Sequence, residues 1–305
     1  MTGLIDIVCG IDSNYAPHLA VMLKSLALYN PKYRFRVHVL NDAVPDDLRR
    51  RVEACNKEIE INWIDAGYHR VLDVEGVEHI SSAAYLRLMM LEVLDPSIKR
   101  VLYLDADIII NGDILPLWNT PLGGKVCAAV SDAWVDAEEF AQKWHLRADG
   151  HYFNSGVMLF DLDKLRSKPY MEQAIKIITT PGHGFKFVDQ DALNIVLWND
   201  WLELDPGWNF QRQFLHNDYA LWNARSTQTK YQPAIVHYTE AYKPWKKNEW
   251  HPCRWLYLRT LLKTPFKSSI LESGEINFYH LCKSWLKWTL KRPPMFALKR
   301  QISAL

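Results

Sequence analysis

The sequence of 305 residues lacks the features that mark several large classes of protein. Its five cysteines are odd in number, widely scattered and without a C-x-x-C pair, which argues against a disulfide framework and a zinc cluster. No basic N-terminal segment leads into a long apolar run, and no charge-free apolar stretch is long enough to cross a bilayer. These absences favour a cytoplasmic protein without a signal peptide or a membrane span.

Two common nucleotide-binding motifs are absent as well. The chain contains no G-x-G-x-x-G and no G-x-x-x-x-G-K-[ST], so neither a dinucleotide fingerprint nor a P-loop is supported. Hydrophobic residues make up 49% of the sequence, which is ample for a full core. A mainly disordered chain is therefore excluded.

The net charge of +1 conceals an uneven distribution of charge. Residues 243–305 hold 13 Lys and Arg against three Asp and Glu, which leaves 23 against 32 for residues 1–242. An acidic body followed by a basic tail indicates that the tail meets an anionic surface.

Short apolar runs alternate with amphipathic segments along most of the chain. The pattern predicts strands at residues 4–9, 35–40, 59–64, 101–104, 127–131, 153–160 and 234–238. It predicts four helices: one that begins at Pro17, one at residues 45–56, one from Ser81 or Ser82 to Leu94, and one at residues 189–198. This alternation predicts an α/β fold with a Rossmann-like, mostly parallel sheet, whose ligands lie beyond the carboxyl ends of the strands. We expect one domain, residues 1–250, followed by an extension, residues 251–305.

The apolar strand expected at residues 101–104 is followed by two carboxylates, Asp105 and Asp107. Two residues apart on extended chain, they point the same way, which suits a hard divalent cation that also binds substrate phosphates. Asp-x-Asp alone is a weak pattern, because it also begins at Asp161 and at Asp189. A helix N-cap explains Asp161 without a metal.

Other polar residues have both a functional and a structural interpretation. Asp12 and Asn14 follow the first strand and suit a nucleotide, although turn formation would explain them equally well. His237 could be a hydrogen-bonded core histidine, Lys243 a solvated charge and Gln190 a residue of a helix start.

Six motifs, in order, resemble those of glycosyltransferase family eight. They are D-S-N-Y at 12–15, Y-L-R-L at 85–88, V-L-Y-L-D-A-D at 101–107, N-S-G at 154–156, D-Q-D at 189–191, and H-Y with K-P-W within 237–245. Within the family, the chain resembles the bacterial lipopolysaccharide α-galactosyl- and α-glucosyltransferases. These have a GT-A fold, use a UDP-sugar with Mn2+, and retain the anomeric configuration.

The resemblance implies roles for individual residues. It implies three ligands for Mn2+, or for Mg2+ as an alternative: Asp105, Asp107 and His237. It implies five residues for the nucleotide and diphosphate of the donor: Asp12, Asn14, Tyr15, Ala106 and Lys243. It implies a donor-sugar pocket, with the last two residues as catalytic candidates: Arg87, Asp132, Asn154, Asp189 and Gln190. The resemblance also implies that His79 contacts the acceptor, because it lies where members of the family do so. At position 240 this sequence has Glu, where many members have Gly.

The implied reaction is transfer of galactose or glucose from a UDP-sugar to a sugar hydroxyl of a glycan, such as a lipopolysaccharide core. Retention can arise through a covalent intermediate, for which Asp189 is a possible nucleophile, or by same-face attack, which we favour. A sugar nucleotidyltransferase would also hold a metal on aspartates, but residues 10–15 lack its glycine-rich, arginine-containing loop. A non-catalytic protein that binds glycan or nucleic acid would leave Asp105 and Asp107 without a role, and we expect no nucleic-acid partner.

The basic tail carries an amphipathic pattern. One side of the expected helix holds Phe278, Leu281, Cys282, Trp285 and Trp288, and the other holds Lys283, Lys287 and Lys291. The pattern is typical of a helix in a membrane interface, and we expect peripheral contact with anionic lipid at the cytoplasmic face of the inner membrane. A helix that packs its apolar stripe on the domain would show the same periodicity.

Overall fold

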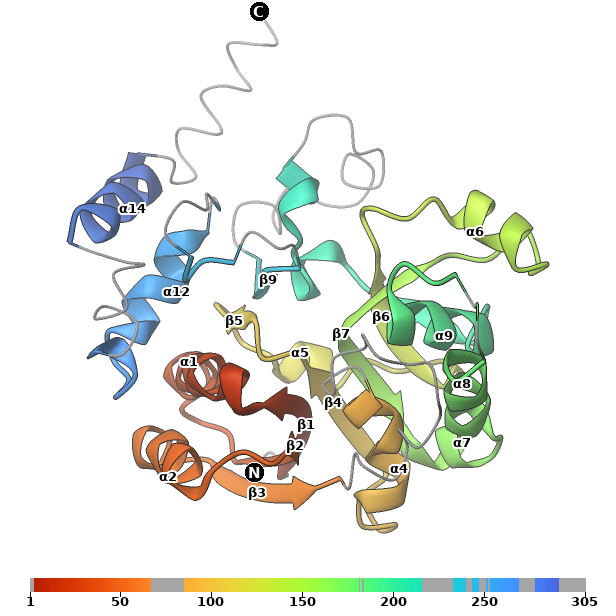
Figure 1. The fold of residues 1–305 in the computed structure, drawn as a ribbon, viewed down its shortest axis with the longest axis horizontal. Helices are drawn as coiled ribbons and strands as arrows, with labels where there is room; N and C mark the ends of the chain where they lie inside the picture. The colour runs from red at the N-terminus through yellow and green to blue at the C-terminus, as the bar shows by residue number, and fades with distance from the viewer. Residues whose placement is uncertain are drawn as a thin grey trace, which may run out of the picture.

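A seven-stranded sheet crosses the molecule, in the strand order β3-β2-β1-β4-β7-β6-β8 (Figure 1). The structure is a computed structural model, and it describes residues 3–66, 85–180, 182, 184–215, 233–239, 243–246, 251, 253–268 and 278–290. A separate two-stranded ribbon pairs β5 (Ile108–Ile110) with β9 (Ile235–His237).

Four of the six strand pairs of the large sheet are parallel, which confirms the mostly parallel sheet. The parallel part comprises β1 (Ile5–Asp12), β2 (Phe35–Asp42), β3 (Glu60–Asp65) and β4 (Arg100–Leu104). The remaining strands are β6 (Cys127–Ser131), β7 (Phe153–Asp161) and β8 (Trp201–Glu203). Strand β7 runs antiparallel to both of its neighbours, a direction that the sequence pattern did not indicate.

Alternate residues of the central strands enter two cores on opposite faces of the sheet, because successive side chains of a strand point to opposite sides. Leu102 and Leu104 of β4 face the first core, and Val101 and Tyr103 face the second. The first core is covered by α1 (Ala16–Tyr29), α2 (Asp46–Cys55), α5 (Leu115–Trp118) and α12 (Arg254–Leu261). The second is covered by α4 (Met90–Val93), α7 (Leu162–Arg166), α8 (Tyr170–Ile178) and α9 (Val188–Val196).

Short helices connect these layers. They are the 3-10 helices η1 (Ser13–Tyr15), η3 (Arg87–Met89), η4 (Pro206–Trp208) and η5 (Arg212–Leu215), and the α-helix α6 (Ala137–Lys143). Asp161 caps α7 by accepting a hydrogen bond from the Lys164 amide at 3.1 Å, which confirms its N-cap interpretation. Ser81 and Ser82, the expected caps of the helix that ends near Leu94, lie outside the described residues.

The first two strands are longer than the apolar pattern predicts. Their backbone ladder continues past the apolar residues to the pair of Asp12 and Asp42. The missed ends mix glycine and polar residues with one buried apolar residue, Ile11, so the apolar run is interrupted although the backbone pairing continues.

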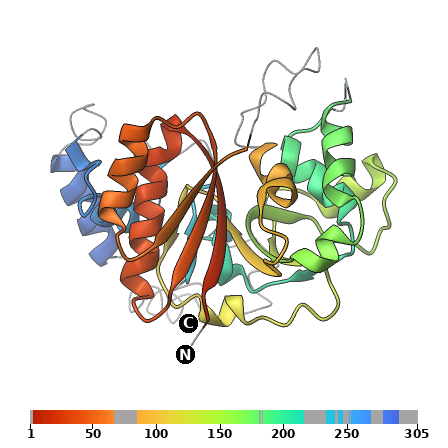
Figure 2. The same cartoon turned by 90° about the horizontal axis from the view of Figure 1, so that it is seen from below.

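The C-terminal helices pack beside α1 and α2 (Figure 2). Leu256, Leu258 and Leu261 of α12 are buried in the first core. Helix α14 (Phe278–Leu290) contacts α12, and its Leu281 packs against the same core. Among the described residues, no helix combines the length and the apolar character that crossing a bilayer requires.

Candidate active site

The carboxyl end of β4 and the amino end of β7 meet at one edge of the sheet, because the two strands are antiparallel. The Asp105 amide donates to the carbonyl of Gly156 at 2.9 Å, which places the residue after β4 beside the first residues of β7. Asn154 and Ser155, the second and third residues of β7, therefore lie at the same edge as the two carboxylates that follow β4.

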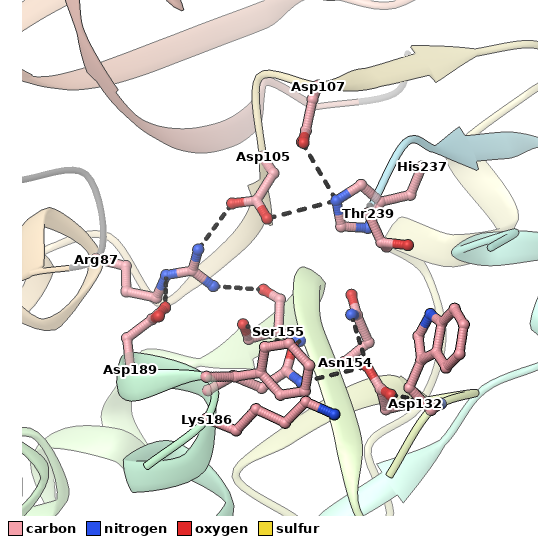
Figure 3. A pocket seen from close by; sticks show the side chains of 13 residues that line it. Arg87, Asp105, Asp107, Asp132, Asn154, Ser155, Lys186, Asp189, His237 and Thr239 are labelled. Carbon is pink, nitrogen blue, oxygen red and sulfur yellow. Dashed lines mark hydrogen bonds and ion pairs between the residues drawn. The ribbon is translucent and has the colours of Figure 1, made fainter. Parts of the chain in front are cut away.

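Asp105, Asp107 and His237 form a cluster that could hold a metal ion (Figure 3). Pairing of β5 with β9 sets His237 opposite Ile108, one residue after Asp107. His237 Nε2 lies 3.6 Å from Asp105 Oδ2 and 3.2 Å from Asp107 Oδ1, and the three ligand atoms lie within 4.8 Å of one another. Asp107 and His237 are buried, which leaves Asp105 as the more accessible ligand.

A chain of hydrogen bonds orients the His237 ring. The Asp132 carboxylate can only accept, so Asn154 donates its Nδ2 to it at 2.9 Å and turns its Oδ1 to Asn209 Nδ2 at 2.8 Å. Asn209 then presents its Oδ1 to His237 Nδ1 at 2.9 Å, which places the ring hydrogen on Nδ1. The lone pair of Nε2 therefore faces the two carboxylates, as it does in histidines that bind metals. These three groups fit a divalent cation.

Gly156 allows this close approach. A Cβ atom at this position would lie 2.1 Å from His237 Cε1 and 2.7 Å from Asp105 Oδ2. Either distance is far below van der Waals contact, so any side chain would displace two of the three candidate ligands.

Arg87 joins the carboxylates of Asp105 and Asp189. Its Nη2 lies 2.8 Å from Asp105 Oδ1, its Nε lies 2.8 Å from Asp189 Oδ2, and its Nη1 donates to the Ser155 carbonyl at 2.8 Å. Burial would lower the pKa of Arg87, but the two carboxylates outweigh burial and raise it. Burial, together with the charge of Asp105, raises the pKa of Asp189 against the opposing effect of Arg87.

Lys243 supplies a positive charge to the cluster. Its Nζ lies 2.5 Å from Asp107 Oδ2 and donates to the carbonyl of Tyr238 at 2.6 Å. Burial would raise the pKa of Asp107, but Lys243 and His237 outweigh burial and lower it. The carboxylate of Asp107 is thus held ionised, the state that a metal ligand requires.

The turn that carries Lys243 is held by residues of α12 and α1. Arg254 donates to the carbonyls of Pro244 at 2.8 Å and Lys246 at 2.7 Å. The Trp245 ring stacks on His18 of α1, with centroids 3.5 Å apart and planes 17° apart. The turn is therefore attached to both α1 and α12.

A cavity of about 530 Å³ opens beside the cluster, within the size range of small-molecule sites. Its lining contains all of the expected metal ligands and all of the expected sugar-pocket residues: Asp105, Asp107, His237, Arg87, Asp132, Asn154, Asp189 and Gln190. Gln190 is fixed in orientation, because its Oε1 accepts from the Ser155 amide at 3.0 Å and its Nε2 donates to Asp132 Oδ2 at 3.2 Å.

The other expected site residues are not part of the lining of this cavity. Asp12 accepts from the Tyr15 amide at 3.1 Å, so the turn-forming interpretation of Asp12 is seen directly. Asn14 is exposed, and Ala106 is buried between the two aspartates. The acceptor candidate His79 and the departure at Glu240 lie outside the described residues.

Several residues of the site were missed in the sequence. Asn209 is fully buried but follows a short 3-10 helix, where no periodicity singles it out. Trp134, Lys186 and Phe187 also line the cavity. Of these, Trp134 could have been found in the sequence, because it lies two residues beyond Asp132, the candidate site residue that follows β6. The side chain of Trp134 is 54% exposed, so it is available to contact a ligand.

Comparisons with known proteins identify the family of this chain. The model of Glycosyl transferase family 8 matches residues 6–249. General stress protein A of Bacillus subtilis is 31% identical over 275 residues, which cover 87% of this chain and 96% of that protein. Lipopolysaccharide 1,2-glucosyltransferase of Escherichia coli is 28% identical over 277 residues, covering 86% and 79%.

A solved structure extends the likeness to the fold. The galactosyltransferase LgtC, in complex with donor and acceptor sugar analogues, matches with a TM-score of 0.73 and 26% identity, covering 89% of this chain and all of that chain. The expected GT-A architecture is confirmed by this match. Because the family match extends over most of the sequence, the chain belongs to glycosyl transferase family 8.

Proposed function

We propose that this glycosyltransferase moves a hexosyl group from a UDP-sugar to a sugar hydroxyl of a glycan, with retention and with a divalent metal. The observation that carries the proposal is the convergence of two carboxylates and the Nε2 lone pair of His237 within 4.8 Å, beside a cavity of about 530 Å³. The nitrogen ligand favours Mn2+ over Mg2+. The similarity to lipopolysaccharide glucosyl- and galactosyltransferases supports a cell-surface glycan as the acceptor.

The residues around the cluster suit the departure of a nucleotide. A bound cation would neutralise the charge that develops on the leaving diphosphate. Lys243, beside Asp107, is placed to add a second positive charge to that group. We assign the nucleotide to residues near the ends of the first and fourth strands: Asp12, Asn14, Tyr15 and Ala106.

The donor sugar is assigned to the side of the cavity away from Lys243. Asp132 and Asn154 offer carboxylate and amide groups to hexose hydroxyls, while Arg87 fixes the carboxylates of Asp105 and Asp189. Gln190 is the proposed catalytic residue, because its amide is held rigidly between Ser155 and Asp132, where it can stabilise charge at the reacting carbon.

We favour same-face attack as the route to retention. A double displacement needs a free nucleophile beneath the anomeric carbon. An amide such as that of Gln190 is a poor nucleophile. The Asp189 carboxylate lies 2.8 Å from the Arg87 guanidinium, and this ion pair makes the carboxylate less available to attack a substrate.

The reaction is tested by release of UDP from UDP-glucose, UDP-galactose and their N-acetyl forms, with Mn2+ and with EDTA. We expect release from at least one donor with Mn2+ and none with EDTA. Equal release in EDTA would contradict the metal assignment. Formation of pyrophosphate from UTP and a hexose 1-phosphate would instead indicate a sugar nucleotidyltransferase.

We propose further that the C-terminal extension, residues 251–305, brings the enzyme to an anionic membrane through α14. Tyr279, Trp285 and Leu286 of this helix are 63%, 50% and 50% exposed, and Cys282 and Lys283 are exposed as well. Aromatic side chains and lysines on one exposed helix are suited to the headgroup region of a bilayer. Leu281 packs inward, so α14 contacts the domain, while Tyr279, Trp285 and Leu286 keep half or more of their surface exposed.

Sedimentation with vesicles tests the membrane proposal. Full-length protein is expected to sediment with phosphatidylglycerol vesicles at low salt, and removal of residues 276–305 is expected to abolish sedimentation without loss of donor hydrolysis. Phosphatidylcholine vesicles are the control for charge. A truncated protein that unfolds, or a full-length protein that ignores anionic vesicles, would favour a purely packed helix. The side chains of Lys287 and Trp288 and the whole of Lys291 lie outside the described structure.

A further inference from the structure

A second cavity, of about 200 Å³, adjoins the donor cavity and is lined by residues of α6 and of the segment that precedes α9. Its lining includes Trp134, Glu139, Lys143, Trp144, Lys186 and Phe187. None of the proposed metal-binding, nucleotide-binding or catalytic residues lines it.

The two cavities share one wall. Trp134, Lys186 and Phe187 line both of them. At the start of α9, Gln190 faces the donor cavity and the next residue, Asp191, faces the second. A ligand that extends from the reacting centre over this shared wall would thus enter the second cavity.

The chemistry of the second cavity suits a neutral, hydroxyl-rich ring. Trp144 packs against Phe185, with ring centroids 4.9 Å apart, and forms part of an aromatic wall. Flat aromatic faces pack well against the C–H faces of a pyranose. The carboxylates of Asp136 and Glu139 can accept hydrogen bonds from its hydroxyls.

Charge and size narrow the choice of ligand. The lining holds three acids, Asp136, Glu139 and Asp191, against two lysines, Lys143 and Lys186, so it offers no net attraction to a phosphate. The volume of about 200 Å³ is below the roughly 300–1,000 Å³ of sites that enclose drug-sized ligands, which indicates a single ring rather than a nucleotide.

We propose that the second cavity binds the sugar residue of the acceptor that adjoins the residue being glycosylated. The reacting sugar would lie in the first cavity near Gln190, and its neighbour would pass over Trp134 and Phe187 to rest against Trp144. This inference rests on the proposed function. It predicts that the second cavity determines the enzyme's preference for acceptors of one or two rings and does not affect the choice of donor.

The test compares one-ring acceptors, methyl β-galactoside and methyl β-glucoside, with the two-ring acceptors lactose, cellobiose and maltose. For the best two-ring acceptor, Trp144→Ala is expected to raise KM about tenfold, the effect of losing one well-packed aromatic contact. Its kcat, the KM for one-ring acceptors and donor hydrolysis stay unchanged. Trp144→Phe restores most of the binding.

Glu139→Gln, at an exposed position that cannot affect folding strongly, raises the KM for the best two-ring acceptor severalfold. Tyr29→Ala is the matched control, a 38% exposed aromatic residue at the end of α1 that lines neither cavity.

Saturation-transfer NMR with the same sugars measures binding without turnover and so separates this inference from the proposed reaction. Two-ring sugars should give signals with the wild-type protein and weaker ones with Trp144→Ala. The inference is overturned if no two-ring sugar binds better than its one-ring counterpart, or if Trp144→Ala weakens both lengths equally. Absence of donor hydrolysis by the wild-type protein would refute the proposed reaction, and the NMR result would still decide the role of the cavity.

Discussion

Lowering the pH from 7 to 5 is expected to destabilise the protein through two buried histidines, His18 and His251. Burial lowers the pKa of His18 to about 3, with Lys243 acting in the same direction and Asp107 against it. Burial, then the charges of Arg212 and Lys243, lowers the pKa of His251 to about 3. Both rings are therefore neutral in the folded protein at pH 5, while the unfolded chain takes up protons there.

The sign and size of the effect follow from linkage between protonation and folding. A histidine whose folded pKa lies below its ordinary value of 6.5 stabilises the fold above pH 6.5 and loses that contribution as the pH falls toward 3. Between pH 7 and pH 5 each histidine costs about 2 kcal/mol, so the two together cost about 4 kcal/mol. That is a large share of the roughly 5–15 kcal/mol by which native proteins are stable.

Urea unfolding at pH 7 and pH 5 measures this loss. His18→Phe keeps an aromatic ring for the stack with Trp245 and should reduce the difference between the two pH values by about 2 kcal/mol. The matched control is Tyr257→Phe, which removes the hydroxyl 2.6 Å from His18 Nδ1 and should lower stability similarly at both pH values. An unchanged pH difference in His18→Phe would refute the reasoning.

Other substitutions test the site itself. Three single changes should each abolish Mn2+-dependent donor hydrolysis without additive effects, because each removes a ligand from one ion: Asp105→Ala, Asp107→Ala and His237→Ala. Near wild-type hydrolysis in EDTA by any of them would contradict this. Gln190→Ala should lower kcat much more than it raises the donor KM, and the reverse pattern would make Gln190 a positioning residue. Gly156→Ala should weaken Mn2+ binding, followed by electron paramagnetic resonance, roughly 10–100-fold, whereas Gly3→Ala, which has open space around it, should not change it.

The sequence predicted best the parts of the fold that depend on local patterns. The run of buried residues in β6 was located to the residue, because a short apolar segment bounded by polar residues has few other structures available. The same reasoning placed Asp105 and Asp107 beyond a buried strand, where the structure has them. These features depend on burial, which hydropathy records directly.

The direction of β7 could not be predicted, because an apolar run is the same for a parallel and an antiparallel strand. Its antiparallel direction explains why Asn154, at the start of a strand, lies at the edge where Asp105 follows the end of another. Asn209 was beyond prediction for a related reason. Its role depends on a contact with Asn154, 55 positions away, and on one with His237, 28 positions away.

The residues after position 250 support the site indirectly, by holding the turn that carries Lys243. Arg254 holds the turn that carries Lys243, and Tyr257 lies against His18 beneath Trp245. Since leucines of α12 also fill the core beside α1, a chain cut at residue 250 would lose both core packing and the support of the proposed diphosphate lysine. Removal of residues 276–305 spares α12 entirely. Only the shorter truncation therefore separates contact with a membrane from the integrity of the site.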